Sequence, residues 1–279
     1  MGALWMLVAG LLFGCMGIFV KLGAATFTNI ELVFWRSFIG LIVVYIIARQ
    51  RNGTLTTPHW RAHAWRGISG TVALTLFFYC ITALPLATAV TLNYTAPLFL
   101  ALLTVLISGD RPTPHLAAAV ALGFVGVVLL LHPTLEKEQI IPGFLGLISG
   151  FLAGVAYLNV KQLGKLGEPE WRVVLYFSLI ASVASGVAML FNPIHLPSLS
   201  SLPVLLGLGT SATLAQLAMT SAYRTGKTLV VGSLAYSTVV FASLFGIVLW
   251  GETLPPSSWA GMALIIASGV IALKLPTKL

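Results

Sequence analysis

Long apolar runs follow one another along the whole chain, with only short polar breaks between them. A helix needs about 20 apolar residues to cross the hydrocarbon core of a bilayer. The runs are continuously apolar, whereas the strands of a membrane barrel alternate between apolar and polar positions. The pattern therefore predicts an all-α integral membrane protein. Breaks at charges, prolines and polar clusters place its spans at residues 3–21, 30–48, 65–84, 87–108, 115–131, 142–162, 172–191, 203–223, 228–250 and 258–275.

Two of the breaks are very short, and the number of spans depends on them. Pro85 separates the third span from the fourth, and the segment from Arg224 to Lys227 separates the eighth from the ninth. If either pair were one helix, that helix would be about twice as long as a bilayer requires. Each pair is therefore interpreted as two helices joined by a tight turn, which brings the count to ten transmembrane helices.

The composition agrees with a chain embedded in a membrane. Of the 279 residues, 58% are hydrophobic and 8% are charged, whereas a soluble domain carries roughly 25% charged residues. The net charge of +8 is spread over the breaks between apolar runs, so no nucleic-acid partner is expected. Cys15 and Cys80 lie inside apolar runs and are interpreted as buried hydrophobic side chains.

The positions of Lys and Arg predict the orientation, because basic residues gather in cytoplasmic loops. With the N-terminus inside, only Lys21 and Lys137 fall outside. We therefore predict a multi-pass protein of the bacterial cell inner (plasma) membrane with both termini cytoplasmic. The residues that fall inside are Arg49, Arg51, Arg61, Arg66, Arg111, Lys161, Lys165, Arg172, Arg224, Lys227, Lys274 and Lys278.

Two segments of the first half recur in the second half, in the same order. GLLFGCMGIFVK at 10–21 aligns with GFLAGVAYLNVK at 150–161. LNYTAPLFLALLTVLISGD at 92–110 aligns with LAYSTVVFASLFGIVLWGE at 234–252. Each half also ends in a GVxxL segment followed by a proline, Pro133 or Pro276. Three blocks in one order indicate an internal repeat.

Each repeat holds five spans, and because five is odd the second repeat must cross the membrane in the opposite sense. Inverted repeats are the architecture of many secondary transporters, which hold their substrate near the midplane between the two repeats. We therefore predict two inverted five-helix repeats around a central cavity, residues 1–134 with spans 1 to 5 and residues 140–279 with spans 6 to 10. This architecture indicates a transporter that works by alternating access.

These features resemble the drug/metabolite transporter superfamily, EamA type. The resemblance covers essentially the whole chain and rests on the repeat, on the start GLLFGCMG, on Asn93-Tyr94-x-x-Pro97, and on the GD and GE turns at 109–110 and 251–252. The chain is similar to the YddG-type exporters of aromatic and other amino acids, and related branches carry riboflavin or S-adenosylmethionine. The resemblance implies that spans 1, 3, 4, 6, 8 and 9 surround the cavity and that spans 5 and 10 lie outside it.

The fourth span carries polar candidates for a substrate site. Pro97 removes a backbone donor and leaves the Asn93 carbonyl without its helical partner, and Asn93, Tyr94 and Pro97 follow one another closely. Such a break can present backbone acceptors to a ligand, although a kink held by a hydrogen bond between helices is equally expected.

The eighth span carries an amide at membrane depth, Gln216, which needs polar partners and faces the protein interior. Met219 and Tyr223 continue its face. A structural hydrogen bond is as expected here as a contact with substrate.

Aromatic and small side chains complete the candidate cavity wall. Phe13, Tyr79, Tyr157 and Tyr236 offer apolar rings, and a tyrosine adds one polar group; core packing is the alternative for each. Glycines recur at helix-packing spacing, and the candidates among them for the cavity are Gly17 and Gly154.

Four charged residues are candidates for gating or anchoring: Lys21, Glu31, Arg36 and Lys161. We expect Arg36 to extend to the membrane surface and Glu31 to contact Lys21 at the outer boundary, with an outer gate or a proton site as the alternative. Because no carboxylate falls at the centre of a span, both a passive cycle and proton coupling through the edge charges stay open.

The sequence favours transport over other classes. The five histidines show no metal-ligand spacing, and no catalytic motif is visible, so we expect no enzyme, cofactor or metal; an intramembrane enzyme and a channel remain the alternatives of another class. We expect export of aromatic or hydrophobic amino acids, with a riboflavin or S-adenosylmethionine type of metabolite as the alternative. Missing central charge disfavours phosphorylated substrates. The expected partners are the lipid bilayer and a small-molecule substrate, with no obligatory protein partner and a monomer or weak homodimer.

Overall fold

The computed structural model describes residues 2–107, 114–131, 137–192, 194–226 and 228–274. Helices account for the regular structure of these residues, and no strand is found in the described ranges. The helices are α1 (Gly2–Gly23), α2 (Asn29–Gln50), α3 (Trp60–Ala83), α4 (Leu86–Asn93), α5 (Ala96–Ile107), α6 (Pro114–Leu131), a 3-10 turn η1 (Lys137–Gln139), α7 (Ile140–Lys165), α8 (Glu170–Met189), α9 (Leu202–Thr225), α10 (Thr228–Ala235), α11 (Ser237–Trp250) and α12 (Pro256–Lys274).

The helices match the ten predicted spans, with two spans broken in the middle. The fourth span is divided into α4 and α5, and the ninth into α10 and α11. By length and composition, α1, α2, α3, α7, α8 and α9 can each cross a membrane. The predicted all-α membrane fold is therefore confirmed. The third span starts earlier than predicted, at Trp60 instead of residue 65, because polar residues read as loop belong to the helix.

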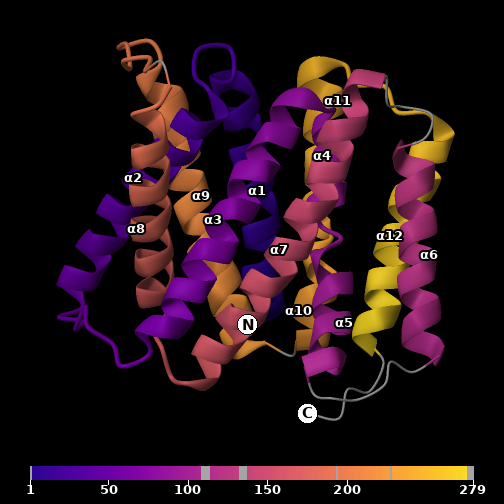
Figure 1. The fold of residues 1–279 in the computed structure, drawn as a ribbon, viewed down its shortest axis with the longest axis horizontal. Helices are drawn as coiled ribbons and strands as arrows, with labels where there is room; N and C mark the ends of the chain where they lie inside the picture. Colours follow the sequence, from indigo (N-terminus) through magenta and orange to yellow (C-terminus); the bar gives the residue numbers. More distant parts are fainter. Residues whose placement is uncertain (1, 108–113, 132–136, 193, 227, 275–279) are drawn as a thin grey trace.

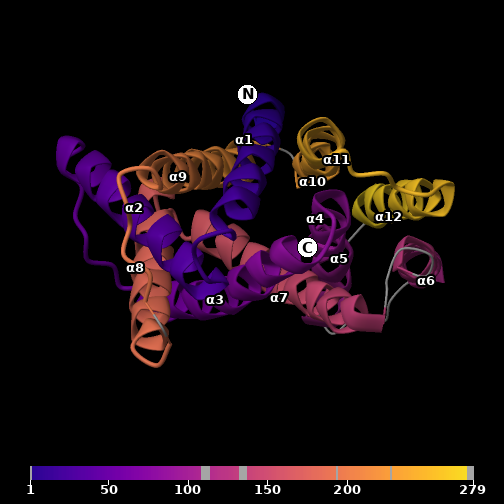
Figure 2. The same ribbon diagram turned by 90° about the horizontal axis from the view of Figure 1, so that it is seen from above.

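The helices stand roughly parallel in one elongated bundle (Figure 1). The α2 and α8 pair forms one edge, the α6 and α12 pair forms the other, and α1, α3, α7 and α9 lie between them (Figures 1 and 2). The α1 helix begins, and α12 ends, at the lower end of Figure 1, which is the predicted cytoplasmic end. The upper, predicted outer end carries the turns from α1 to α2 and from α3 to α4.

The outside of the bundle is strongly apolar. Many large hydrophobic side chains are exposed along its helices, among them Trp65, Leu106, Val183, Leu206 and Val248. An exposed apolar surface of this extent calls for an apolar partner, and lipid tails supply one. The buried core, in contrast, contains many Ala and Gly residues, as expected where membrane helices approach closely.

Both broken spans break at the same aligned position. The turn between α4 and α5 contains Tyr94, and the turn between α10 and α11 contains Tyr236, which the repeat alignment pairs. The position aligned with Pro97 is Val239, so a proline is not required for the second break. Broken helices at matching points of two repeats are typical of secondary transporters.

Paired glycines press against these two breaks. A Cβ on Gly10 of α1 would lie 2.5 Å from Ser237 Oγ. Its aligned partner Gly150 of α7 touches the aligned Thr95 in the same way, and its Cβ would lie 2.7 Å from the Leu92 carbonyl oxygen. Each repeat therefore packs its first helix against the broken helix of the other repeat.

The next aligned glycines repeat the arrangement one turn on. A Cβ on Gly14 would lie 3.2 Å from Phe241 Cβ, and a Cβ on Gly154 would lie 3.1 Å from Phe99 Cβ. Phe99 and Phe241 are also aligned. The internal repeat thus extends to individual contacts, and at Gly154 it supports the packing interpretation of that glycine.

Ion pairs at the outer end differ from the prediction. Lys21 pairs with Glu252, whose carboxylate also accepts the backbone N–H of Leu86 at 3.0 Å. Glu31 caps α2 through Thr28 and accepts the backbone N–H of His195 at 2.5 Å. The expected contact between Lys21 and Glu31 is therefore wrong, because each has a partner on a later loop that the sequence did not bring near.

Several positions used in the repeat alignment lie outside the described residues. They are the end of the aligned block, residues 108–110 with Asp110 opposite Glu252, and the prolines that end the two halves, Pro133 and Pro276.

Candidate functional site

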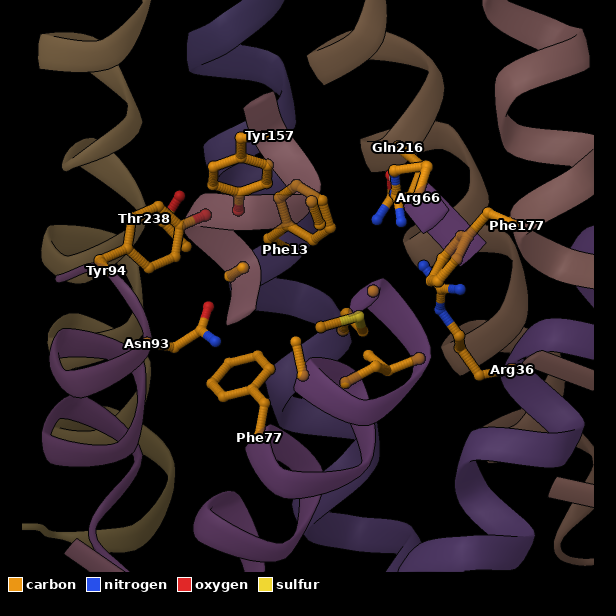
Figure 3. Close-up of a pocket in the computed structure, with 16 residues that line it drawn as sticks. Phe13, Arg36, Arg66, Phe77, Asn93, Tyr94, Tyr157, Phe177, Gln216 and Thr238 are labelled. Carbon is orange, nitrogen blue, oxygen red and sulfur yellow. The ribbon is translucent and has the colours of Figure 1, made fainter. Parts of the chain in front are cut away.

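A cavity lies between the two repeats (Figure 3), with about 600 Å³ of empty space that includes its opening to solvent. Its walls come from α1, α3, α4, α7, α9 and α11, which belong to the spans 1, 3, 4, 6, 8 and 9 that the family resemblance implied. Two further helices, α2 (the second span) and α8 (the seventh span), also contribute. The outer pair α6 and α12 supplies none of its lining residues. The lining consists of Phe13, Met16, Arg36, Arg66, Gly70, Ala73, Leu74, Phe77, Asn93, Tyr94, Ala153, Ala156, Tyr157, Phe177, Gln216 and Thr238.

The first helices of the two repeats line the cavity with aligned faces. Phe13 and Met16 of α1 align with Ala153 and Ala156 of α7, and all four line the cavity. The α1 side carries the bulky residues and the α7 side the small ones. Equivalent positions of both repeats therefore line the cavity, and the difference in side-chain size between them makes it asymmetric.

One side of the cavity is polar and uncharged. Asn93 and Tyr94, where α4 ends, face Thr238 of α11 (Figure 3). Asn93 Nδ2 donates to Ser149 Oγ at 2.7 Å, and Ser149 Oγ donates to the Ala73 carbonyl oxygen at 2.8 Å. This chain of hydrogen bonds between helices fixes the orientation of the Asn93 amide at the cavity wall.

The opposite side is cationic. Arg36 of α2 and Arg66 of α3 are 2% and 3% exposed, and both guanidinium groups lie against the ring of Phe177 (Figure 3). The Cζ atoms of Arg36 and Arg66 lie 5.0 and 4.1 Å from its centroid. Arg66 Nη2 donates to Gln216 Oε1 at 3.3 Å.

Within the described part of the chain, neither arginine forms an ion pair. Arg36 Nε and the Nε and Nη1 atoms of Arg66 are buried and make no hydrogen bond with described residues. A buried cation without a counter-ion is costly. Two of them together therefore mark a position where an anionic group would be strongly stabilised.

The structure overturns two interpretations made from the sequence. Arg36 does not extend to the membrane surface; it points inward because Phe177 and the cavity accept its guanidinium group. The argument that missing central charge disfavours phosphorylated substrates also fails, because Arg66, predicted at the cytoplasmic end of the third span, lies about two turns inside α3 and lines the cavity.

A second cavity, with about 770 Å³ of space, lies towards the predicted cytoplasmic end, where α7, α8 and α9 meet. Lys161 lines it together with Lys165, Glu168 and Arg224. Tyr223 also lines it and pairs with Tyr157 of the central cavity, with 5.9 Å between the ring centroids. This pair of tyrosines separates the two cavities.

The predicted site residues divide into two groups. Phe13, Asn93, Tyr94, Tyr157 and Gln216 come together in the central cavity, and Tyr223 borders it. The others lie elsewhere. Tyr79 is 36% exposed on the outside of α3, and the remaining ones are packing positions: Gly17 against Leu86, Gly154 against α5, and Pro97, Met219 and Tyr236 in the buried interior.

Sequence reasoning missed Arg66, Phe77, Phe177 and Thr238 as lining residues. One signal was available for Arg66. Gly70 follows it by one helical turn, and a Cβ at Gly70 would collide with Arg66 Nη1. An arginine one turn before a glycine can fold its side chain along its own helix. Phe177 and Thr238 gave no comparable signal, because apolar and hydroxyl residues are frequent throughout these helices.

The described residues contain no cluster that could hold a metal ion. The arrangement offers an apolar middle, a polar uncharged side and a cationic side. It can therefore bind an amphipathic small molecule and fix its direction in the cavity.

Comparison with known proteins supports the same class. The EamA-like transporter family matches residues 1–132 and again residues 141–273. An uncharacterized transporter of Helicobacter pylori is 30% identical, over 100% of this chain and 96% of the relative. A pseudopaline exporter of Pseudomonas aeruginosa is 27% identical over 96% and 94%, and a riboflavin transporter of Rhizobium johnstonii is 25% identical over 98% and 91%. A crystal structure with 19% identity superposes with a TM-score of 0.73 over 97% of this chain and 96% of the other, which supports the fold.

Proposed function

Because the chain belongs to the EamA-like transporter family, we propose that it exports small amphipathic metabolites by alternating access, with aromatic and hydrophobic amino acids as the first candidates. The observation that carries the proposal is the central cavity between the two repeats. It is lined by aligned faces of α1 and α7, and it lies beside the break between α4 and α5.

The lining suits a substrate with an apolar body and polar ends. Phe13, Phe77 and Phe177 supply aromatic surface, and aromatic rings stack well on one another. Asn93 and the Tyr94 and Thr238 side chains supply hydrogen-bonding groups at one side. An amino acid with an aromatic side chain has groups for each of these surfaces.

A carrier of a riboflavin-like metabolite is the second candidate, supported by the relative named a riboflavin transporter and by the same aromatic walls. S-adenosylmethionine carries a sulfonium cation, which the two arginines disfavour. The proposal includes three further points: the direction of transport is export, both termini are cytoplasmic, and the repeats are residues 1–134 and 140–279.

Uptake by purified protein in liposomes tests it. We expect saturable flux of phenylalanine and leucine, with mutual competition, in a panel that also contains riboflavin and S-adenosylmethionine. Riboflavin flux without flux of any amino acid would reject the leading candidate.

Two polar residues of the cavity give a second readout. Asn93→Ala and Gln216→Ala should each lower flux about tenfold, because each removes a hydrogen-bonding group from the cavity. Asn192→Ala and Gln50→Ala are the controls, since both residues are exposed outside the cavity, and both should leave flux unchanged. Normal flux in both cavity variants would remove these residues from the site.

A further inference from the structure

Among the described residues, the two arginines of the central cavity are set apart by being both buried and without an ion pair, since the other unpaired basic side chains are exposed or partly exposed. Glu31, Glu168, Glu170 and Glu252 all have cationic partners or helix ends to stabilise them. Arg36 and Arg66 have only the Phe177 ring and, for Arg66, the amide of Gln216. The protein therefore supplies two buried positive charges and leaves their neutralisation to something else.

The two charges act at one place. Because both Cζ atoms lie near the same phenyl centroid, the guanidinium groups are separated by no more than the sum of those two distances. A guanidinium group binds carboxylate and phosphate oxygens through paired N–H donors. An acidic group between or beside the two arginines can accept hydrogen bonds from both and neutralise both.

The absence of a side chain at Gly70 leaves space for the Arg66 guanidinium group. A Cβ at Gly70 would collide with Arg66 Nη1 and would lie 3.0 Å from Phe177 Cε2. Arg66 is also turned towards Gln216, which accepts from Nη2 and leaves Nε and Nη1 without a partner in the described residues. Gly70 and Gln216 are therefore positioning residues for this guanidinium group.

We propose that Arg36 and Arg66 form one anion site that holds the acidic end of the transported substrate, and that they select amphipathic organic anions carrying two negative charges over those carrying one. The inference rests on the proposed function and narrows it within the amphipathic metabolites: dianions are favoured, and an amino acid, with one carboxylate and one ammonium group, would occupy the same site more weakly. The apolar body lies along Phe13 and Phe77, and the far end reaches Asn93, Tyr94 and Thr238 (Figure 3).

The acidic end can be a pair of carboxylates or a phosphate monoester, because the guanidinium fork fits both. Neutral and cationic molecules of the same shape leave both arginines unpaired. They should therefore bind more weakly, even when the rest of the cavity is filled equally well.

The test uses four probes that share a phenyl ring. Their binding to the full-length protein in detergent is measured by the concentration that protects against thermal unfolding. The probes are benzylmalonate with two carboxylates, 3-phenylpropionate with one, phenyl phosphate, and 3-phenylpropanamide without charge. We expect benzylmalonate to bind at least tenfold tighter than 3-phenylpropionate, and 3-phenylpropanamide to bind most weakly. The affinity of phenyl phosphate relative to benzylmalonate distinguishes the two kinds of acidic end.

Variants assign the preference to the arginines. Arg36→Gln and Arg66→Gln should each weaken benzylmalonate binding about tenfold or more and reduce its advantage over 3-phenylpropionate. Arg36→Lys should keep part of that advantage, because a lysine retains the charge without the fork. Arg49→Gln on α2 and Arg61→Gln on α3 remove the same charge from exposed positions of the same helices and should change nothing.

Measurements on the wild-type protein are enough to overturn the inference. Either equal protection by 3-phenylpropanamide and benzylmalonate, or no protection by benzylmalonate, would do so. Equal losses for all four probes in the arginine variants would also overturn it, because that pattern indicates a structural role. If benzylmalonate does not bind but amino-acid flux is normal, the anion site is rejected and the proposed function stands. Absence of amino-acid flux with intact benzylmalonate binding rejects the amino-acid proposal alone.

Discussion

Arg36 and Arg66 reach the same Phe177 ring from helices that enter the bundle at opposite ends. The α2 helix starts at the predicted outer end, α3 starts at the predicted cytoplasmic end, and each contributes its arginine about two turns in. Two cations are thus brought together in the interior by antiparallel neighbours. The arrangement is unfavourable for stability, which points to a role in binding.

This relationship predicts a gain in stability when one charge is removed. Replacing a buried ionic group by an apolar side chain of similar volume is often neutral or stabilising by about 1–4 kcal/mol. Arg36→Met should therefore raise the unfolding temperature of the purified protein while weakening anion binding. Thermal unfolding in detergent measures the first effect, and Arg49→Met at the exposed end of α2 should shift it by no more than about 0.5 kcal/mol. A clear loss of stability in Arg36→Met would instead show that Arg36 is a structural residue.

The contact between Gly150 and Thr95 predicts a strongly position-dependent effect along α7. A Cβ at Gly150 would collide with the Thr95 hydroxyl and the Leu92 carbonyl, and such overpacking costs about 1–3 kcal/mol. Gly150→Ala should therefore lower the unfolding temperature. Gly164→Ala on the same helix is the control, because nothing lies within 4 Å of its Cβ position. Equal behaviour of the two variants would mean that α7 does not press against the break.

The outer ion pair of Lys21 and Glu252 links α1 to the loop after α11 and to the start of α4. It is largely shielded from solvent, so we expect a coupling energy of about 1–3 kcal/mol in a double-mutant cycle of Lys21→Met and Glu252→Gln. The pair of Arg224 and Glu170, whose arginine is about half exposed, provides the comparison and should couple by less than about 1 kcal/mol. The same coupling in both cycles would show that the outer pair contributes no more than a surface contact.

The turn between α7 and α8 predicts an acid-sensitive contact. Burial alone would raise the pKa of Glu168, but hydrogen bonds from Thr57 and Arg172 and the nearby His63 bring it below its ordinary value of 4.5. Because the folded state binds the proton less tightly than the unfolded state, the carboxylate stabilises the fold fully above pH 4.5. That contribution is lost as the pH falls through the lowered pKa. Unfolding temperatures of wild type and Glu168→Gln should therefore differ at neutral pH and converge at acidic pH; a constant difference would contradict this role.

Much of the fold could be predicted from the sequence, because hydrophobic length and basic loops are local signals. The repeat alignment even paired Tyr94 with Tyr236, the two residues at the helix breaks. The break itself was attributed to Pro97 alone. The second break has no proline at the aligned position; α1 approaches it closely through Gly10, a long-range contact that no local pattern reveals.

The candidate site was less predictable, because depth in the membrane does not say which way a side chain points. Tyr79 and Tyr157 look alike in sequence, yet one is exposed on the outside of the bundle and the other lines the cavity. The predicted span 65–84 places Arg66 at its cytoplasmic end, whereas α3 begins five residues earlier, at Trp60, and Arg66 therefore lies deeper in the bundle. Pairing of the two arginines could be found only once α2, α3 and α8 were placed in space.

The central claim is that the cavity between the repeats is reached alternately from both membrane faces. The most direct measurement is labelling of a single cysteine, Ala153→Cys, in a chain whose Cys15 and Cys80 are replaced by serine. The reagent is the membrane-impermeant (2-sulfonatoethyl) methanethiosulfonate, applied to either face of sealed vesicles. Phe151→Cys, on the lipid-facing side of the same helix, is the control and should stay unlabelled. The account predicts labelling of residue 153 from both faces; labelling from one face only, or from neither, would contradict it.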